Sequence, residues 1–389
     1  MILTRNLVIA LIATIISFST LYIPQPMLPL LADSFGVSVG EAGLLMTLAM
    51  LPLAVAPVVY GYFLQAIPAR LMLIVALGLL ALNQVCFYLV EEFWQMLLLR
   101  FLQGLLLPAI FTALMTYCAS TVPVTMVRRA LGFYIGATIL GGFCGRLVGG
   151  IFASWFDWHT AFVVMGLMQL LPLILLLKAE SDADINFARL DRKSVYRVLG
   201  ERNYRLMFIA LASVFFVFSG ILNIIPFHLR DLEPGSTPLV ISMLYLGYLI
   251  GAPVSFCSDR ISGKLRDERT GLLLGLGIHA CGLVMLLFVA FHGLILMMFL
   301  LAAGFFLMHA LLSGLANHIA SEHRGVVNGL YVSIYYFSGA LGSWLPGYLY
   351  EALAWRGMIL LFMLILVVCA WSIIRFDNPA SRGNPPRKP

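Results

Sequence analysis

Long apolar stretches with very few charges recur along this chain of 389 residues, and they restrict its fold more than any other feature. Only 11% of the residues are charged and 61% are hydrophobic, whereas a soluble globular chain carries about 25% charged residues. A run of roughly 20 apolar residues crosses the hydrocarbon core of a bilayer as a helix. Because a helix satisfies its own backbone polar groups in lipid, we expect an all-α membrane protein.

Twelve such stretches can be marked, and each predicts a membrane-spanning helix. They cover residues 6–30, 42–64, 70–90, 93–118, 129–153, 160–178, 205–228, 237–257, 270–291, 294–319, 326–350 and 356–375. The longest polar interruption, 179–204, predicts a cytoplasmic linker between two six-helix bundles at 1–178 and 205–375. The tail at 376–389 is rich in proline, glycine and arginine, which predicts a disordered cytoplasmic segment.

A glycine-rich stretch at 139–158 has a second copy near 337–355, and a shift of 197 residues aligns the two without a gap. The shift pairs Gly145 with Gly342, Gly150 with Gly347, Trp158 with Trp355, and Arg146 with Ser343. Such a period indicates an internal duplication. The two bundles should therefore be pseudo-symmetric and should differ at one charged position.

Orientation follows from the distribution of Lys and Arg. With both termini in the cytoplasm, twenty of the 24 basic residues fall in inner segments and only Arg230 and Arg356 in outer loops. The last two, Arg100 and Arg146, lie within spans, and all 18 acidic residues lie outside the membrane interior. We therefore interpret the net charge of +6 as a topology signal and expect no nucleic-acid partner.

Several motifs carry a family resemblance. The first span ends in Tyr22-Ile-Pro-Gln25-Pro-Met-Leu-Pro29, the fourth contains Arg100-Phe-Leu-Gln103-Gly104, and the fifth contains Gly145-Arg146. Gly304-Phe-Phe with His309, and Leu330-Tyr331 with Tyr335-Tyr336, follow in the second half. Together these resemble the major facilitator superfamily, in its twelve-helix branch of drug:proton antiporters and arabinose-efflux-like proteins. The resemblance implies a transporter of the bacterial cytoplasmic (inner) membrane that works by alternating access.

One loop departs from the family pattern. The loop after the second span usually contains an Asp-Arg pair, whereas this chain has Gln65-Ala66 and, further on, Arg70. The corresponding loop of the second half keeps Asp259-Arg260 and Lys264. The resemblance implies a gating role for these charges, which the second half retains, whereas the first half lacks the Asp-Arg pair.

Small residues predict where helices approach closely. Gly141, Gly145 and Gly149 repeat every four residues, so they share one helix face. Gly342 and Gly347 take the same part in the second half. Two slender bundles that rock about a central site fit alternating access.

Polar residues within the spans are the candidate site. A buried charge costs about 2.5–3.5 kcal/mol on insertion scales, so Arg100, with Gln103 one turn away, should face a wet cavity. Arg146 could do the same or reach the outer surface. His309 lies near the middle of its span, either as a proton carrier or as a neutral histidine bonded across helices. The remaining candidates for cavity lining are Tyr22, Gln25, Asn223, Asn328, Tyr331 and Tyr335.

These features favour a monomeric secondary transporter that exports a small organic solute, driven by protons or by the membrane potential. Two buried arginines without an acid favour an anion, such as a siderophore or a carboxylate metabolite, or a sugar. A multidrug proton antiporter is the alternative. A membrane-embedded enzyme is disfavoured, because metalloprotease, hydrolase and P-loop motifs are absent. A channel would need symmetric rings or a filter motif. We expect no metal or cofactor, and we expect membrane lipid and protons as further partners.

Overall fold

The computed structural model describes residues 4–63, 68–179, 192–265, 267–319 and 324–376, and their regular secondary structure is helical. The N-terminal bundle contains α1 (Arg5–Tyr22), α2 (Leu28–Phe35), α3 (Val39–Phe63), α4 (Ala69–Cys86), α5 (Phe93–Ser120), α6 (Val127–Trp155) and α7 (Trp158–Leu177). After α8 (Arg192–Gly200), the C-terminal bundle contains α9 (Arg202–Leu232), α10 (Pro238–Met243), α11 (Gly251–Lys264), α12 (Glu268–Met285), α13 (Phe291–Ile319) and α14 (Arg324–Arg375). The 3₁₀ segments are η1 (Gln25–Met27), η2 (Phe87–Leu89), η3 (Val124–Met126) and η4 (Leu244–Ile250).

These helices make twelve spans, which confirms the number predicted from sequence. Ten segments of the described residues are long and apolar enough to cross a membrane. One of them, α14, has 52 residues, or about 78 Å at 1.5 Å per residue, against a hydrocarbon core of about 30 Å. It breaks at Ala354, whose φ of 53° is not helical, and so contributes two spans. The 18-residue α12, which packs along α13, is the twelfth.

The helix ends are fixed by local chemistry. Asp157 and Asp267 accept the backbone N–H groups of Thr160 and Thr270, which caps α7 and α12. At the end of α1, Pro24 cannot donate a backbone hydrogen bond, so the helix gives way to η1 before α2 continues the span. The first span therefore consists of two helices, α1 and α2, which the short η1 segment joins.

The duplication is visible in the packing of each bundle. A Cβ on Gly145 of α6 would collide with the backbone of Ser19 in α1, and a Cβ on Gly342 of α14 would collide with the backbone of Phe216 in α9. Ser19 and Phe216 are themselves 197 residues apart. The same contact is therefore built twice, and glycine is required at both places because the backbones touch.

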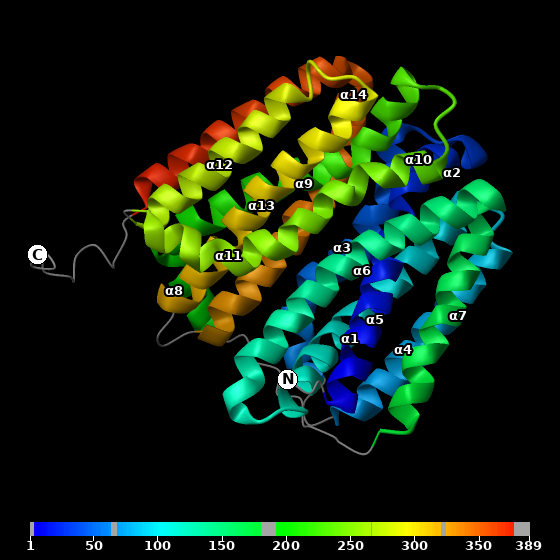
Figure 1. Ribbon diagram of the computed structural model, residues 1–389, viewed down its shortest axis with the longest axis horizontal. Coiled ribbons are helices and arrows are strands. Elements are labelled where there is room, and N and C mark those ends of the chain that lie inside the picture. The colour runs from blue at the N-terminus through cyan, green and yellow to red at the C-terminus, as the bar shows by residue number, and fades with distance from the viewer. Residues whose placement is uncertain (1–3, 64–67, 180–191, 266, 320–323, 377–389) are drawn as a thin grey trace, which may run out of the picture.

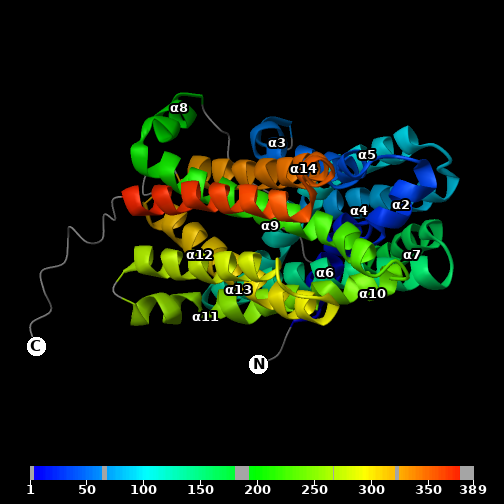
Figure 2. The ribbon, with the colours of Figure 1, turned by 90° about the horizontal axis from the view of Figure 1, so that it is seen from above.

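The two bundles lie side by side, with α2 and α10 at one end of the molecule and α8 at the other (Figures 1 and 2). At the end that carries α2 and α10 the bundles are in contact. The backbone N–H of Val39 donates to Glu351 at 2.7 Å, and that of Leu239 donates to Ser154 at 2.8 Å. Gly347 of α14 lies against Gly40 of α3. The space between the bundles is therefore closed at this end.

The linker contains structure that the sequence did not indicate. Residues 179–204 were expected to be only a connecting segment, but residues 192–200 within them form α8, which packs on α9 and α14. Residues 180–191 of the linker and the tail expected to be disordered, 377–389, lie outside the described residues.

Candidate functional site

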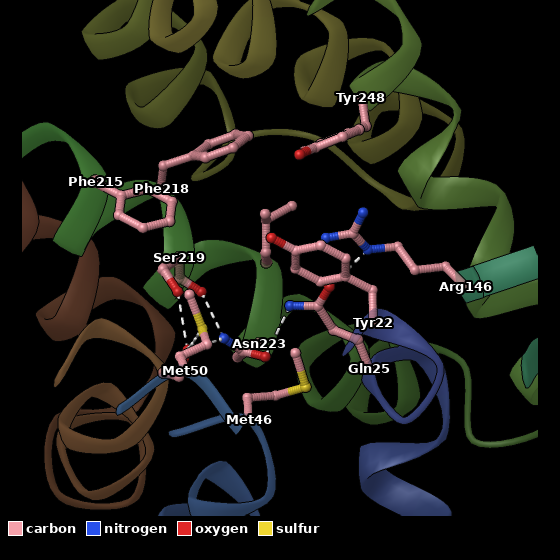
Figure 3. A pocket seen from close by; sticks show the side chains of 12 residues that line it. Tyr22, Gln25, Met46, Met50, Arg146, Phe215, Phe218, Ser219, Asn223 and Tyr248 are labelled. Atoms are coloured by element: carbon pink, nitrogen blue, oxygen red, sulfur yellow. Dashed lines mark hydrogen bonds between the residues drawn. The ribbon is translucent and has the colours of Figure 1, made fainter. Parts of the chain in front are cut away.

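A small cavity lies between the two bundles and is lined by side chains from both (Figure 3). In this state its free volume is about 10 Å³, room for about one water molecule, so the lining side chains must move apart to admit a solute. Its lining consists of Tyr22, Gln25, Met46, Met50, Arg146, Phe215, Phe218, Ser219, Leu222, Asn223, Tyr248 and Ser343. Among these twelve residues there is one charged side chain, Arg146, and no carboxylate.

Arg146 reaches into the cavity from α6, and its side chain is fully buried. The guanidinium carbon lies 4.4 Å from the ring centroid of Tyr22, 4.7 Å from that of Tyr245 and 4.6 Å from that of Tyr248. Aromatic faces stabilise a cation at such distances. The interpretation that Arg146 could extend to the outer surface is therefore wrong, because the tyrosines hold its charge inside the protein.

The hydrogen bonds of Arg146 are incomplete. Its Nε donates to Oε1 of Gln25 at 2.6 Å, and Nη1 donates to the backbone carbonyl of Gly142 at 2.9 Å. The remaining terminal nitrogen, Nη2, has no hydrogen-bond partner in the described structure. A buried N–H group without an acceptor is costly, so the site is poised to receive an acceptor from a ligand.

Gln25 connects Arg146 to the C-terminal bundle. Its Oε1 accepts from Arg146, and its Nε2 donates to Oδ1 of Asn223 at 2.8 Å. Asn223 in turn donates to the Ser343 hydroxyl at 2.8 Å and to the carbonyl of Ser219 at 2.9 Å. The chain of hydrogen bonds thus runs from α6 through η1 and α9 to α14.

Arg146 and Ser343, which the internal duplication aligns, lie at opposite ends of this chain. Both line the same cavity although they belong to different bundles. The charged difference between the two repeats is therefore located at the functional site, and it makes one side of the cavity basic and the other neutral.

Arg100 does not line the cavity, so the expectation that it faces a wet site is wrong. It is fully buried, and all three of its nitrogens donate to protein atoms. Their acceptors are the carbonyls of Thr20, Leu21 and Leu45, Oε1 of Gln103, and Sδ of Met46. Pro24 has no N–H to offer Thr20, four residues earlier, so this carbonyl is free to accept from the arginine. Arg100 therefore satisfies backbone carbonyls at the end of α1, next to the break in the first span.

His309 lies beside the cavity without lining it. Its Nδ1 is 2.9 Å from the hydroxyl of Tyr331, and its ring centroid is 4.9 Å from that of Tyr335. Tyr335 stacks at 3.8 Å on Phe215, which does line the cavity. Asn328, expected on the same face, is half-buried and is not a lining residue.

The expected gating residues lie in two helices of different bundles, Arg70 in α4 and the other three in α11. Arg70 donates to the carbonyls of Leu176 and Leu177, at 2.9 and 2.8 Å, so it caps the end of α7 within its own bundle. Arg260 and Lys264 are exposed, and the side chain of Asp259 is not among those that the structure describes.

Of the residues predicted to line the cavity, Tyr22, Gln25, Arg146 and Asn223 are brought together. The sequence did not point to most of the apolar wall or to the polar residues Tyr248 and Ser343. Ser343 had a usable signal, since the duplication aligns it with Arg146. The methionines and phenylalanines gave none, because such residues also fill the core of each bundle.

Two pseudo-symmetric six-helix bundles with a polar cavity between them are typical of a membrane transporter. The sequence pattern of the Major Facilitator Superfamily matches residues 10–343. This chain belongs to that superfamily, as its motifs indicated.

Known relatives agree with this assignment. The inner membrane transport protein YnfM of Escherichia coli (strain K12) is 25% identical over 371 residues, which cover 92% of this chain and 86% of that protein. The multidrug resistance protein MdtG of Rahnella sp. (strain Y9602) is 25% identical over 274 residues, which cover 68% of this chain and 66% of that protein. Among solved structures, a bacterial homologue of the human lysosomal transporter Spinster, in an inward-facing and occupied conformation, is similar with a TM-score of 0.69. The two chains are 15% identical, and the match covers 94% of this chain and 91% of the homologue's chain, which shows a shared fold.

Proposed function

We propose that this protein is a secondary active transporter that exports a small, acceptor-rich organic solute across the bacterial inner membrane by alternating access. The observation that carries the proposal is the unpartnered Nη2 of Arg146, which is buried beside the cavity between the bundles. Guanidinium offers planar donors suited to carboxylates and hydroxyls. With no acid in the lining, an anion or a sugar fits this charge better than a cation does.

The termini and α8 are assigned to the cytoplasm in this proposal, in line with the distribution of Lys and Arg. The end that carries α2 and α10 is then the extracellular end, and the cavity is closed on that side. For an exporter, such a state would take up substrate from the cytoplasm. The function is transport rather than catalysis.

The driving force follows from the charge of the substrate. An inside-negative potential drives each exported negative charge outward by about 2.3 kcal/mol per 100 mV. A neutral sugar gains nothing from the potential and would need exchange with protons, for which His309 is the candidate carrier. Voltage-driven export of an anion and proton-linked export of a sugar are therefore the two forms of the proposal.

A multidrug antiporter is the second candidate, because the cavity wall contains Met46, Met50, Phe215 and Phe218. Methionine and aromatic side chains adapt to varied apolar ligands, and one relative is named as a multidrug resistance protein. Against this candidate stands the buried charge of Arg146, which repels cations in a medium of low dielectric constant.

Transport by the purified protein in proteoliposomes tests the proposal. Anionic, neutral and cationic solutes should be compared while the pH gradient and the voltage are set separately. Arg146→Ala should abolish transport of the anion or sugar, whereas Arg356→Ala, which removes an exposed arginine far along α14, should not. Equal transport of lipophilic cations by the wild type and Arg146→Ala would reject the proposal in favour of the multidrug candidate.

A further inference from the structure

The donors available to a ligand are concentrated at one end of the cavity. Arg146 keeps Nη2 unpaired there, while the hydroxyls of Tyr22 and Tyr248 point into the same space (Figure 3). The tyrosine rings lie against the guanidinium, so an acceptor has to approach it in the guanidinium plane. A carboxylate matches this geometry, because its two oxygens lie in one plane and it forms charge-assisted hydrogen bonds with arginine.

The opposite polar end is already satisfied within the protein. Both hydrogens of the Asn223 amide are donated, to Ser219 and Ser343, and its oxygen accepts from Gln25. The hydroxyls of Ser219 and Ser343 both contact the carbonyl of Gly339, at 2.9 and 2.8 Å. A ligand hydroxyl placed at this end would have to displace a bond that the protein already makes.

Between these ends the wall is apolar. Phe215 and Phe218 form one side, and Phe218 is held rigidly by stacking on Phe305 at 4.1 Å. Met46, Met50 and Leu222 contribute the rest of the apolar surface. Polar groups buried against such a wall lose their water without replacement, whereas an apolar body is favoured there.

From this distribution we infer that the substrate is a small amphipathic carboxylate, whose anionic head binds Arg146 and whose compact apolar body lies against Phe215 and Phe218. The inference rests on the proposed transport function and narrows it. A sugar or polyhydroxylated acid is excluded, because most of its hydroxyls would find no free partner.

Equilibrium binding to the purified protein in detergent tests this inference without interference from passive permeation of weak acids. The probes are phenylacetate, its neutral analogue phenylacetamide, the polyhydroxylated anion gluconate, the sugar arabinose and the cation phenethylamine. Phenylacetate should bind at least tenfold more tightly than each of the others. Arg146→Gln should remove this preference over phenylacetamide, and Phe218→Ser should weaken phenylacetate about tenfold while leaving gluconate unchanged.

The outcomes separate the inference from the proposed function. If gluconate or arabinose binds more tightly than phenylacetate, and Arg146→Gln loses this preference, the inference is overturned. The proposed export of an anion or sugar is then still supported. Tighter binding of phenethylamine, unaffected by Arg146→Gln, overturns both. If Arg146→Gln does not fold, Arg146→Lys, which keeps the charge and alters the planar donors, takes its place and should reduce the preference for phenylacetate. If neither variant folds, the ranking of the five probes by the wild type decides.

Discussion

Asp33 in α2 and Arg230 in α9 form an ion pair between the two bundles, and they are 197 residues apart, which is the shift that relates the internal repeats. Residues related by a twofold axis touch each other only where they lie next to the axis. Arg230 also donates to the carbonyl of Pro29 at 3.0 Å. The duplication thus placed opposite charges at equivalent positions, and they meet on the pseudo-twofold axis at the end that carries α2 and α10.

This ion pair should hold that end closed. Asp33→Arg brings two guanidinium groups together and should favour opening, whereas the exchange Asp33→Arg with Arg230→Asp should restore the attraction. Exposed pairs contribute about 0.2–1 kcal/mol, so the ratio of open to closed states should change by up to about fivefold. Labelling of a cysteine introduced at Asn223 by an impermeant maleimide added from that side measures the opening.

The control for this experiment is Asp33→Asn, which removes attraction without adding repulsion and should give an intermediate rate of labelling. Failure of the exchanged pair to slow labelling below the rate of Asp33→Arg would show that the ion pair does not control the closure.

The stability of the protein should respond differently to the same substitution at Arg100 and at Arg146. Arg100→Gln leaves backbone carbonyls of α1 and α3 without donors, at a cost of about 1–3 kcal/mol for each buried group. Arg146→Gln loses the contacts with three tyrosine rings but also removes the desolvation cost of a buried charge that has no acidic partner, so the free energy of unfolding should fall less than in Arg100→Gln. Thermal unfolding in detergent, followed alongside substrate transport, distinguishes a stability defect from a binding defect. Equal loss of thermal stability in the two variants would contradict these roles.

Glycine contacts between helices give a prediction about packing. Gly145→Ala and Gly342→Ala each introduce a methyl group against the backbone of the neighbouring helix, and should destabilise the protein by about 1–3 kcal/mol. Gly277→Ala is the matched control, since nothing lies within 4 Å of its Cβ position and alanine favours a helix by up to about 1 kcal/mol. The melting temperature should fall for the first two variants and should not fall for the control.

His309 remains the candidate for proton coupling. An imidazole changes its charge between about pH 5 and 8, and the hydroxyl of Tyr331 contacts its Nδ1 at 2.9 Å. His309→Gln should flatten the pH dependence of transport, whereas Tyr331→Phe should displace the profile without flattening it. An unchanged profile in His309→Gln, measured in proteoliposomes at fixed voltage, would reject the role and favour transport driven by voltage alone.

Acid should weaken the start of α12. The hydroxyl and the backbone N–H of Thr270 both donate to Asp267, and they lower the pKa of its carboxyl below the ordinary value of 3.8. A lowered pKa means that the cap stabilises the helix above the ordinary value and loses its effect as the pH falls through the lowered one. Hydrogen exchange at Thr270 should therefore show protection at pH 6 that declines below about pH 4, relative to intrinsic exchange. Asp267→Ala should lack this protection at both pH values.

Most of the fold could be predicted because the bilayer allows few solutions. Apolar stretches long enough to cross it must be helices, so their number and approximate ends followed from composition. The linker helix α8 could not be predicted in this way, since its 9 residues are too few to cross a bilayer and it packs on α9 and α14. The 197-residue shift predicted the duplication, and it also relates Asp33 to Arg230, although only the structure showed that these two residues touch.

The sequence by itself determined that two arginines are buried without a carboxylate nearby. It could not determine which of them is available to a ligand, because that depends on the acceptors that neighbouring helices present. Arg100 meets carbonyls of α1 and α3, next to the break at Pro24, and its donors are consumed. Arg146 meets three tyrosine rings, which stabilise its charge without accepting its terminal Nη2. Hydrogen bonds need an acceptor in a particular direction, and only the tertiary structure decides where those acceptors lie.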